Sequence, residues 1–258
     1  MPVTIDLSGK SAIVFGVANH RSIAWAIAKQ LHEAGAHITL AYQNERLRDQ
    51  VDKLAAELDD ADTVECDVMN PTSLVVAFKQ ASSGKNALEI AVHSIAFARR
   101  EDLEGEFSQI DLDGFHTALD VSAFSLIPIT RLAAEYMTEG GSVITMTFHA
   151  ADRVYPGYNI MGVAKAALEN EVKQLAAEYG QQRLRVNAIS AGPLSTLAAR
   201  GIHGFTDMQK AHAARAPLGR NITQEEVGSS ALFLASEMSS GITGTIIYVD
   251  AGYHVMGV

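Results

Sequence analysis

The stretch Ser11-Ala-Ile-Val-Phe15-Gly16-Val-Ala-Asn-His-Arg-Ser22-Ile-Ala24 decides the fold class, because an apolar run is followed by a glycine turn and then by the start of a helical segment. The same alternation of short apolar runs with longer amphipathic segments continues towards the C-terminus. Several runs are apolar without interruption, which is typical of strands in a parallel sheet covered on both faces. The alternation therefore predicts an α/β fold with a right-handed, doubly wound parallel sheet.

The pattern also predicts where the elements lie. The strands are expected at Ser11–Phe15, His37–Tyr42, Thr63–Cys66, Glu89–His93, Ser142–Met146, Arg185–Ile189 and Thr245–Val249. The helices are expected near Ser22–Ala34, Glu45–Leu58, Pro71–Ala81, Gly114–Met137, Tyr158–Tyr179 and Gln224–Ser236. No linker interrupts the chain, so residues 1–258 are predicted to form one Rossmann-like domain with a seven-stranded sheet and helices on both faces. The segment from about 191 to 221 has no clear period and is predicted to be a substrate-binding loop.

Composition excludes several classes of protein. The chain is 48% hydrophobic and has a formal net charge of −10 without a Lys/Arg cluster, which argues against nucleic-acid binding. The single cysteine, Cys66, excludes an intramolecular disulfide framework and fits a reducing cytoplasm. The N-terminus does not resemble a signal peptide, and no apolar run approaches the length that spans a bilayer. The nine histidines show no spacing typical of metal ligands, so we expect a cytoplasmic protein without a metal site.

The first turn carries a signal for a dinucleotide. Gly16 lets the backbone turn tightly at the end of the first strand, and the next helix offers free N–H groups to a pyrophosphate. Ser22 is expected to cap this helix and to donate a hydrogen bond to a phosphate. The usual three-glycine pattern is absent, because Ser22 and Ala24 stand at the later glycine positions. An ordinary strand–helix turn therefore remains an alternative.

The ends of the next two strands carry the other polar candidates. Gln43 follows the second strand in place of an acidic residue and is able to bond both ribose hydroxyls without bringing charge. Arg46 and Arg48 leave a 2′-phosphate conceivable at the same place. Asp67 follows the third strand, where a carboxylate would lie beside the adenine amino group; a helix-capping or turn role is the alternative.

Tyr158 and Lys165 are the candidate catalytic residues. They stand seven residues apart, almost two helical turns, so both side chains are predicted to share one face of a helix. A phenol beside an ammonium forms a proton-donating, charge-stabilising pair. Many nicotinamide oxidoreductases carry such a pair at a spacing of four. The wider spacing suits the reduction of an enoyl thioester, in which the hydride goes to the β carbon while negative charge collects on the carbonyl oxygen.

Several separated motifs occur together in a characteristic order. They are Leu7-Ser-Gly-Lys10, Gly16…Ser22-Ile23-Ala24, Tyr42-Gln43-Asn44, Cys66-Asp67-Val68, His93-Ser-Ile95-Ala96-Phe97-Ala98, Tyr158…Lys165, Val186-Asn-Ala-Ile-Ser-Ala-Gly-Pro193 and Tyr248-Val-Asp-Ala-Gly252. With these motifs, the chain resembles the bacterial enoyl-acyl-carrier-protein reductases, a divergent branch of the short-chain dehydrogenase/reductases, over essentially its whole length. The resemblance implies NADH-dependent reduction of the trans-2 double bond of a fatty acyl thioester on acyl carrier protein, with hydride transfer to C3 and an enolate stabilised by Tyr158.

The resemblance also assigns residues to the cofactor and the substrate. It implies that the dinucleotide contacts Ser22, Ile23, Gln43, Asp67, Val68 and Ile95. It further implies that Lys165 binds the nicotinamide ribose, that Leu194 meets the carboxamide and that Thr196 lies near the pyrophosphate. Ala98 is expected at the substrate site. Members of the family are usually homotetramers.

Some features depart from the family or leave alternatives open. The family typically has a second tyrosine ten residues before the catalytic one, where this chain has Phe148, which packs against substrate but donates no hydrogen bond. Met161 shares a helical face with Tyr158 and Lys165, and either substrate contact or plain helix packing explains it. His149 is a candidate general acid, weighed against an exposed or capping role.

Two other functions remain as alternatives. A carbonyl or hydroxyl oxidoreductase of the same superfamily requires a lysine four residues after the tyrosine, but Gly162 stands there. A non-catalytic dinucleotide-binding regulator gives no reason to retain the Tyr158 and Lys165 pair. Carrier protein is acidic like this chain, so docking needs a local positive patch. The candidate docking residues are Arg200, Lys210, Arg215 and Arg220.

Overall fold

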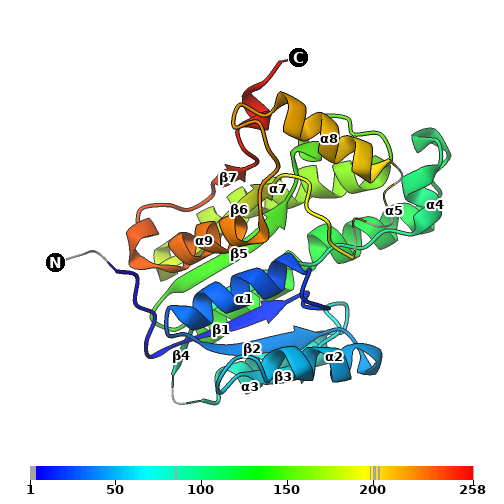
Figure 1. Cartoon of the computed structure of the whole chain (residues 1–258). Helices are drawn as coiled ribbons and strands as arrows, with labels where there is room; N and C mark the ends of the chain where they lie inside the picture. Colours follow the sequence, from blue (N-terminus) through cyan, green and yellow to red (C-terminus); the bar gives the residue numbers. More distant parts are fainter. Residues whose placement is uncertain (1–3, 85, 198, 200–201, 203, 258) are drawn as a thin grey trace.

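The computed structural model describes residues 4–84, 86–197, 199, 202 and 204–257. A parallel sheet of seven strands, in the order β3-β2-β1-β4-β5-β6-β7, forms its centre (Figure 1). The strands are β1 (Lys10–Phe15), β2 (His37–Tyr42), β3 (Asp62–Glu65), β4 (Ala87–His93), β5 (Gly141–Thr147), β6 (Leu184–Ala191) and β7 (Ile246–Val249). The predicted fold class is confirmed, and every predicted strand lies within two residues of its observed bounds.

Helices cover both faces of the sheet. One face carries α1 (Ile23–Glu33), α2 (Glu45–Ala55) and α9 (Gln224–Ala235). The other carries α3 (Pro71–Ala81), α6 (Leu126–Tyr136) and α7 (Asn159–Tyr179). Successive β1 residues point to opposite faces, so Val14 joins the core under α1 while Phe15 packs on Phe78 of α3. The uninterrupted apolar runs of the sequence are the result of this two-sided burial.

The expected helix Gly114–Met137 is wrong as a single α-helix. The segment consists of α5 (Leu112–Leu119), a π-helical turn at Asp120–Phe124 and α6. Pro128 provides a physical reason, because it has no N–H to donate to a carbonyl in the preceding turn. π-helical turns are frequent at functional sites, and this one lies under the loop that follows β4.

Two helices were not expected. α4 (Arg100–Glu104) lies in the loop after β4, and α8 (Phe205–Arg215) lies inside the segment predicted to be a loop from 191 to 221. His212 is the only buried residue of α8 among the described residues, so the helix shows no apolar period in the sequence.

One helical stretch, Leu112–Tyr136, is long and apolar enough to cross a membrane by length and composition alone. The expectation that no run approaches this length is therefore corrected. Half of its most apolar window is buried in the fold, as in the core helices that pass the same test.

The apolar circumference of the long helices is covered in part by the same chain. Leu126, Ile129, Leu168 and Val172 are fully buried in one core cluster, so these residues do not require a partner. Phe124 remains 50% exposed, and Phe107, Leu112 and Phe115 are exposed near it in sequence.

Candidate active site

The carboxyl ends of the strands meet along one edge of the sheet, where Gly16 follows β1. Gly16 has a φ of +97°, and a β-carbon there would overlap the carbonyl of Ser94 after β4. Only glycine allows the two strand ends to approach so closely. The turn predicted from the sequence is therefore present.

The N-terminus of α1 suits an anionic group. No side chain caps this helix and no acidic residue lies in its first turn, so its first N–H groups are free to bind phosphate oxygens. Ser22 occupies the N-cap position, but its hydroxyl oxygen accepts from the N–H groups of Ala18 and Asn19 at 3.0 and 3.1 Å. The expected cap by the Ser22 side chain is therefore wrong; the hydroxyl orders the preceding turn instead. This chain's own residues thus fit a pyrophosphate.

The ends of β2 and β3 present the polar residues expected from the sequence. Gln43 and Asp67 are both exposed beyond their strands. One Asp67 oxygen accepts from the N–H of Met69 at 3.0 Å, which is the turn role weighed as the alternative. The Arg48 side chain donates to the Tyr42 hydroxyl at 2.8 Å and pairs with Glu45 at 3.2 Å, so its charge is already engaged.

The apolar cofactor candidates lie on the same edge. Ile23 and Leu194 pack partly buried against the core cluster under α1, and Val68 and Ile95 do so on the opposite face. All four lie near strand ends, so the edge has an apolar floor beside the free N–H groups of α1.

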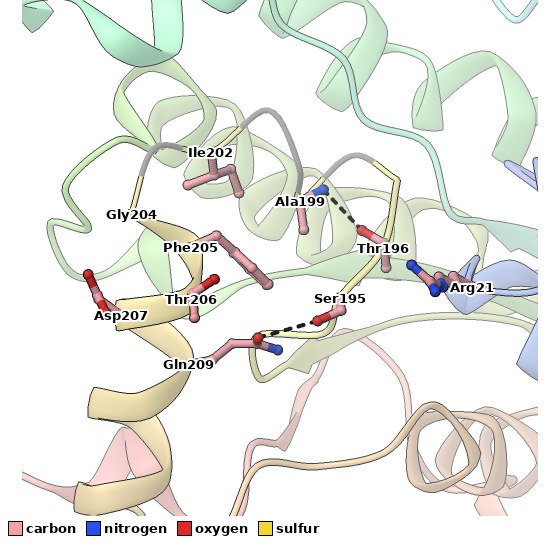
Figure 2. A pocket seen from close by; sticks show the side chains of 10 residues that line it. All are labelled: Arg21, Ser195, Thr196, Ala199, Ile202, Gly204, Phe205, Thr206, Asp207 and Gln209. Carbon is pink, nitrogen blue, oxygen red and sulfur yellow. Dashed lines mark hydrogen bonds between the residues drawn. The ribbon is translucent and has the colours of Figure 1, made fainter.

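An open pocket of about 450 Å³ lies between the start of α1 and α8. It is lined by Arg21, Ser195, Thr196, Ala199, Ile202, Gly204, Phe205, Thr206, Asp207 and Gln209. Figure 2 shows the Arg21 guanidinium pointing towards Thr196, while the Thr196 hydroxyl accepts from the N–H of Ala199 at 3.1 Å. Arg21 is a residue that the sequence reasoning missed, although a cation immediately before the helix start was a signal for an anion.

Tyr158 lies at the N-cap of α7, against Phe148. The two ring centroids are 5.0 Å apart with an interplanar angle of 58°. Burial raises the pKa of Tyr158 above its ordinary value, so the phenol keeps its proton at neutral pH. A protonated phenol in an apolar setting is suited to donating a hydrogen bond to a developing oxyanion.

Lys165 is buried on α7 with only 4% of its surface exposed. Its ammonium donates to the carbonyl of Met146 on β5 at 2.8 Å. Burial lowers the pKa of Lys165 from 10.5 to about 8, partly opposed by Glu169 one helical turn further on. Glu169, which the sequence reasoning missed, accepts from the hydroxyl of Thr147 at 2.8 Å. Its position four residues after Lys165 was the available signal.

Two of the residues expected at the substrate site, Met161 and Ala98, belong to one small apolar cluster. Met161 is buried in a small cluster with Ile160, against which Ala98 packs, and it lies 3.6 Å from the Ser122 hydroxyl. Met161 therefore packs between helices, and its contact with substrate stays a prediction; Ala98 lies at the edge of the same cluster. His149 is buried and lies 3.1 Å from the Tyr155 hydroxyl, so the exposed role weighed for it is wrong.

Two of the docking candidates are already paired. Lys210 lies 3.4 Å from Asp207, and Arg220 lies 2.6 Å from Glu226. Arg215 is exposed, and Arg200 lies outside the described residues. In the part of the chain that the structure describes, no group of three or more His, Cys, Asp or Glu side chains is placed to hold a metal ion.

A doubly wound parallel sheet, a glycine turn before an uncapped helix and a Tyr–Lys pair at the same edge define a nicotinamide-dependent oxidoreductase of the short-chain dehydrogenase/reductase class. Within that class, the family described as Enoyl-(Acyl carrier protein) reductase matches residues 16–254, and this chain belongs to it.

Individual relatives are similar along almost their whole length. The enoyl-acyl-carrier-protein reductase (NADH) FabI of Nostoc sp. is 47% identical over 256 residues, 98% of this chain and 99% of that one. The FabI of Bacillus subtilis is 46% identical over 255 residues, again 98% and 99%.

Solved structures give the same result. The Bacillus cereus enoyl-acyl carrier protein reductase with NADP+ and indole naphthyridinone has a TM-score of 0.95 at 47% identity, covering 98% of this chain and 100% of that one. The Anaplasma phagocytophilum reductase in complex with NAD has a TM-score of 0.94 at 41% identity, covering 100% and 98%.

Proposed function

We propose that this protein reduces the trans-2 double bond of fatty acyl thioesters on acyl carrier protein with NADH, in the elongation cycle of fatty acid synthesis in the cytoplasm. One observation carries the proposal beyond family membership. Tyr158 begins α7 against the apolar ring of Phe148, and Lys165 lies buried further along the same helix. This arrangement provides one hydrogen-bond donor beside an apolar ring and one buried positive charge on the same helix.

The two residues have separate roles. Tyr158 donates a hydrogen bond to the thioester carbonyl and stabilises the enolate, and Phe148 keeps water from competing for the same phenol. Lys165 keeps one ammonium proton on the Met146 carbonyl, and its other protons are available to ribose hydroxyls. When bound, NADH supplies the hydride that goes to C3 of the enoyl chain.

The edge of the sheet at the carboxyl ends of the strands holds the cofactor. The free N–H groups of α1 and the Arg21 guanidinium bind the pyrophosphate, with Thr196 beside it. Gln43 bonds the adenosine ribose without adding charge. Arg48 is engaged by Tyr42 and Glu45, whereas Arg46 is exposed and has no ion pair among the described residues. The preference for NADH over NADPH therefore rests on Gln43, which brings no charge to bind a 2′-phosphate.

The close packing at Gly162 argues against a carbonyl reductase of the same superfamily. A β-carbon at Gly162 would lie 2.9 Å from the carbonyl oxygen of Ala150, so no lysine fits four residues after Tyr158. The tight contact between α7 and the turn at His149–Ala151 therefore excludes the spacing which that reaction uses.

Charge identifies a candidate docking residue for acyl carrier protein, and exposed apolar residues identify a candidate contact with a second copy of the chain. Arg215 is the docking candidate for acidic carrier protein that remains exposed and without an ion pair among the described residues. The exposed Phe107, Leu112, Phe115 and Phe124 require cover, which a second copy provides in a homotetramer of dihedral symmetry.

Turnover measurements test the function. The rate of NADH oxidation is measured with crotonyl and with acetoacetyl carrier protein, each also with NADPH. We expect a higher kcat/KM for the crotonyl thioester and for NADH. A preference for acetoacetyl carrier protein would instead support the carbonyl reductase.

A further inference from the structure

The helix α8 packs against the rest of the fold with one buried side chain. It has 11 residues, and His212 is its only buried residue within the described part of the chain. The His212 side chain is polar and has 2% of its surface exposed, although apolar residues usually hold a surface helix in place. Its contacts therefore determine where α8 lies.

The His212 ring lies between the C-terminal turn and the end of β6. It stacks on Tyr253 with ring centroids 4.3 Å apart and an interplanar angle of 15°. On another side, its Cε1 and Nε2 atoms lie 3.2 Å from the position that a β-carbon of Gly192 would occupy. Figure 1 shows α8 beside the C-terminal segment. Because Gly192 has no side chain, the ring rests directly on the backbone.

Two buried polar atoms of the 191–221 segment have no hydrogen-bond partner among the described residues. They are the Nδ1 atom of His212 and the Oδ1 atom of Asn221. Gly192 stands near the start of this segment, and the imidazole of His212 lies against its backbone.

The same helix forms a wall of the pocket in Figure 2. Phe205 and Gln209 of α8 line that pocket, and the Gln209 amide donates to the Pro193 carbonyl at 3.1 Å. Gln209 stands one turn before His212, so a displacement of His212 moves Gln209 with it.

We propose that His212 is a positioning residue that seats α8 and thereby sets the shape of the pocket in Figure 2, which Arg21 and Thr196 also line. The part that concerns the cofactor rests on the proposed function, which places the pyrophosphate beside these two residues. His212 acts through the helix and not on the reacting atoms, so its loss affects binding of NADH more than the chemical step.

Protonation of the His212 ring provides a second measurable effect, the pH dependence of how α8 is seated. Burial lowers the pKa of His212, and Asp250 and the Asn221 side chain oppose this while His149 adds to it. Asp250 is itself bound to His254 at 3.0 Å. The released helix therefore binds a proton more readily than the seated one, so acidification through the ordinary histidine range favours release.

The experiment compares His212→Ala, His212→Phe and Gly192→Ala with the control His32→Ala, a histidine near the end of α1. Hydrogen exchange of the α8 amides is measured without substrate, from pH 7 to pH 5 and corrected for intrinsic rates. We expect His212→Ala and Gly192→Ala to speed exchange in α8 about tenfold, because the first removes the ring that stacks on Tyr253 and the second places a methyl group 3.2 Å from that ring. Exchange in β4 and β5 should match the control.

Two further results complete the test. His212→Phe keeps a stacking ring, so its α8 exchange should stay flat with pH while that of the wild type rises on acidification. His212→Ala should raise KM for NADH with kcat within about twofold of wild type. Unchanged α8 exchange in both His212→Ala and Gly192→Ala would overturn the proposal. Altered exchange in a protein that reduces no enoyl thioester would overturn the proposed function alone.

Discussion

Replacing Lys165 with methionine should stabilise the protein while weakening its binding of NADH. Burial lowers the pKa of Lys165 from 10.5 to about 8, which corresponds to about 3 kcal/mol of unfavourable free energy for the charged folded state, at 1.36 kcal/mol per pH unit. Methionine has a similar volume but leaves the Met146 carbonyl without its donor, at a cost of about 1 kcal/mol. The net gain in the free energy of unfolding is about 2 kcal/mol at pH 7, or roughly 4–8 °C in Tm.

The pH dependence of the stability difference between the two proteins tests whether burial of the charged Lys165 causes it. Below pH 8 the ammonium is charged in both the folded and the unfolded wild type, so the cost of burial is fully present. Between pH 8 and 10.5 only the unfolded state holds the proton, so the wild type gains stability relative to the variant as pH rises. The difference between the two proteins should therefore shrink across this window.

Calorimetry at one fixed protein concentration measures the difference from pH 7 to pH 10. Titration with NADH should show about 10- to 100-fold weaker binding by Lys165→Met, because a charged hydrogen bond to the ribose is lost. A variant less stable than wild type at pH 7, or a difference that stays constant with pH, would refute the assignment of an electrostatic cost to Lys165.

Three other changes test the site and the assembly. Tyr158→Phe should lower kcat by about 10²–10³ with NADH affinity near wild type, since one oxyanion donor is lost; unchanged turnover in a steady-state assay excludes the role. Gly162→Ala should lower Tm, because the new methyl would lie 2.9 Å from the Ala150 carbonyl; a Tm equal to wild type contradicts this packing. Light scattering at micromolar concentration should give the mass of four chains, and a mass of one chain of 27.6 kDa rules out the tetramer.

The sheet was predictable because its signal is local. The five inner strands, β1, β2, β4, β5 and β6, are buried on both faces by helices from both layers, so an uninterrupted apolar run such as Ile13–Phe15 marks such a strand directly. The bounds of the helix after Asn70 were equally predictable, since the asparagine caps the chain at Pro71 with its own side chain.

The features that the sequence did not show depend on contacts between distant segments. The one buried side chain of α8 in the described part of the chain is the polar His212, whose stacking partner Tyr253 stands far along the chain. The Ser22 side chain had two plausible N–H partners, and only the closed turn determines that it bonds Ala18 and Asn19. The isolation of Lys165 from water likewise comes from packing of α7 on β5, which no local pattern records.

The position of the transferred hydride tests the central proposal most directly. Crotonyl carrier protein is reduced with NADH that carries deuterium at C4, and the butyryl product is analysed by mass spectrometry and NMR. The account predicts deuterium at C3 of the butyryl chain, with the C2 proton coming from solvent. Two results together would contradict it. The crotonyl substrate would be recovered without deuterium, and a separate incubation with acetoacetyl carrier protein would place deuterium on a hydroxyl-bearing carbon.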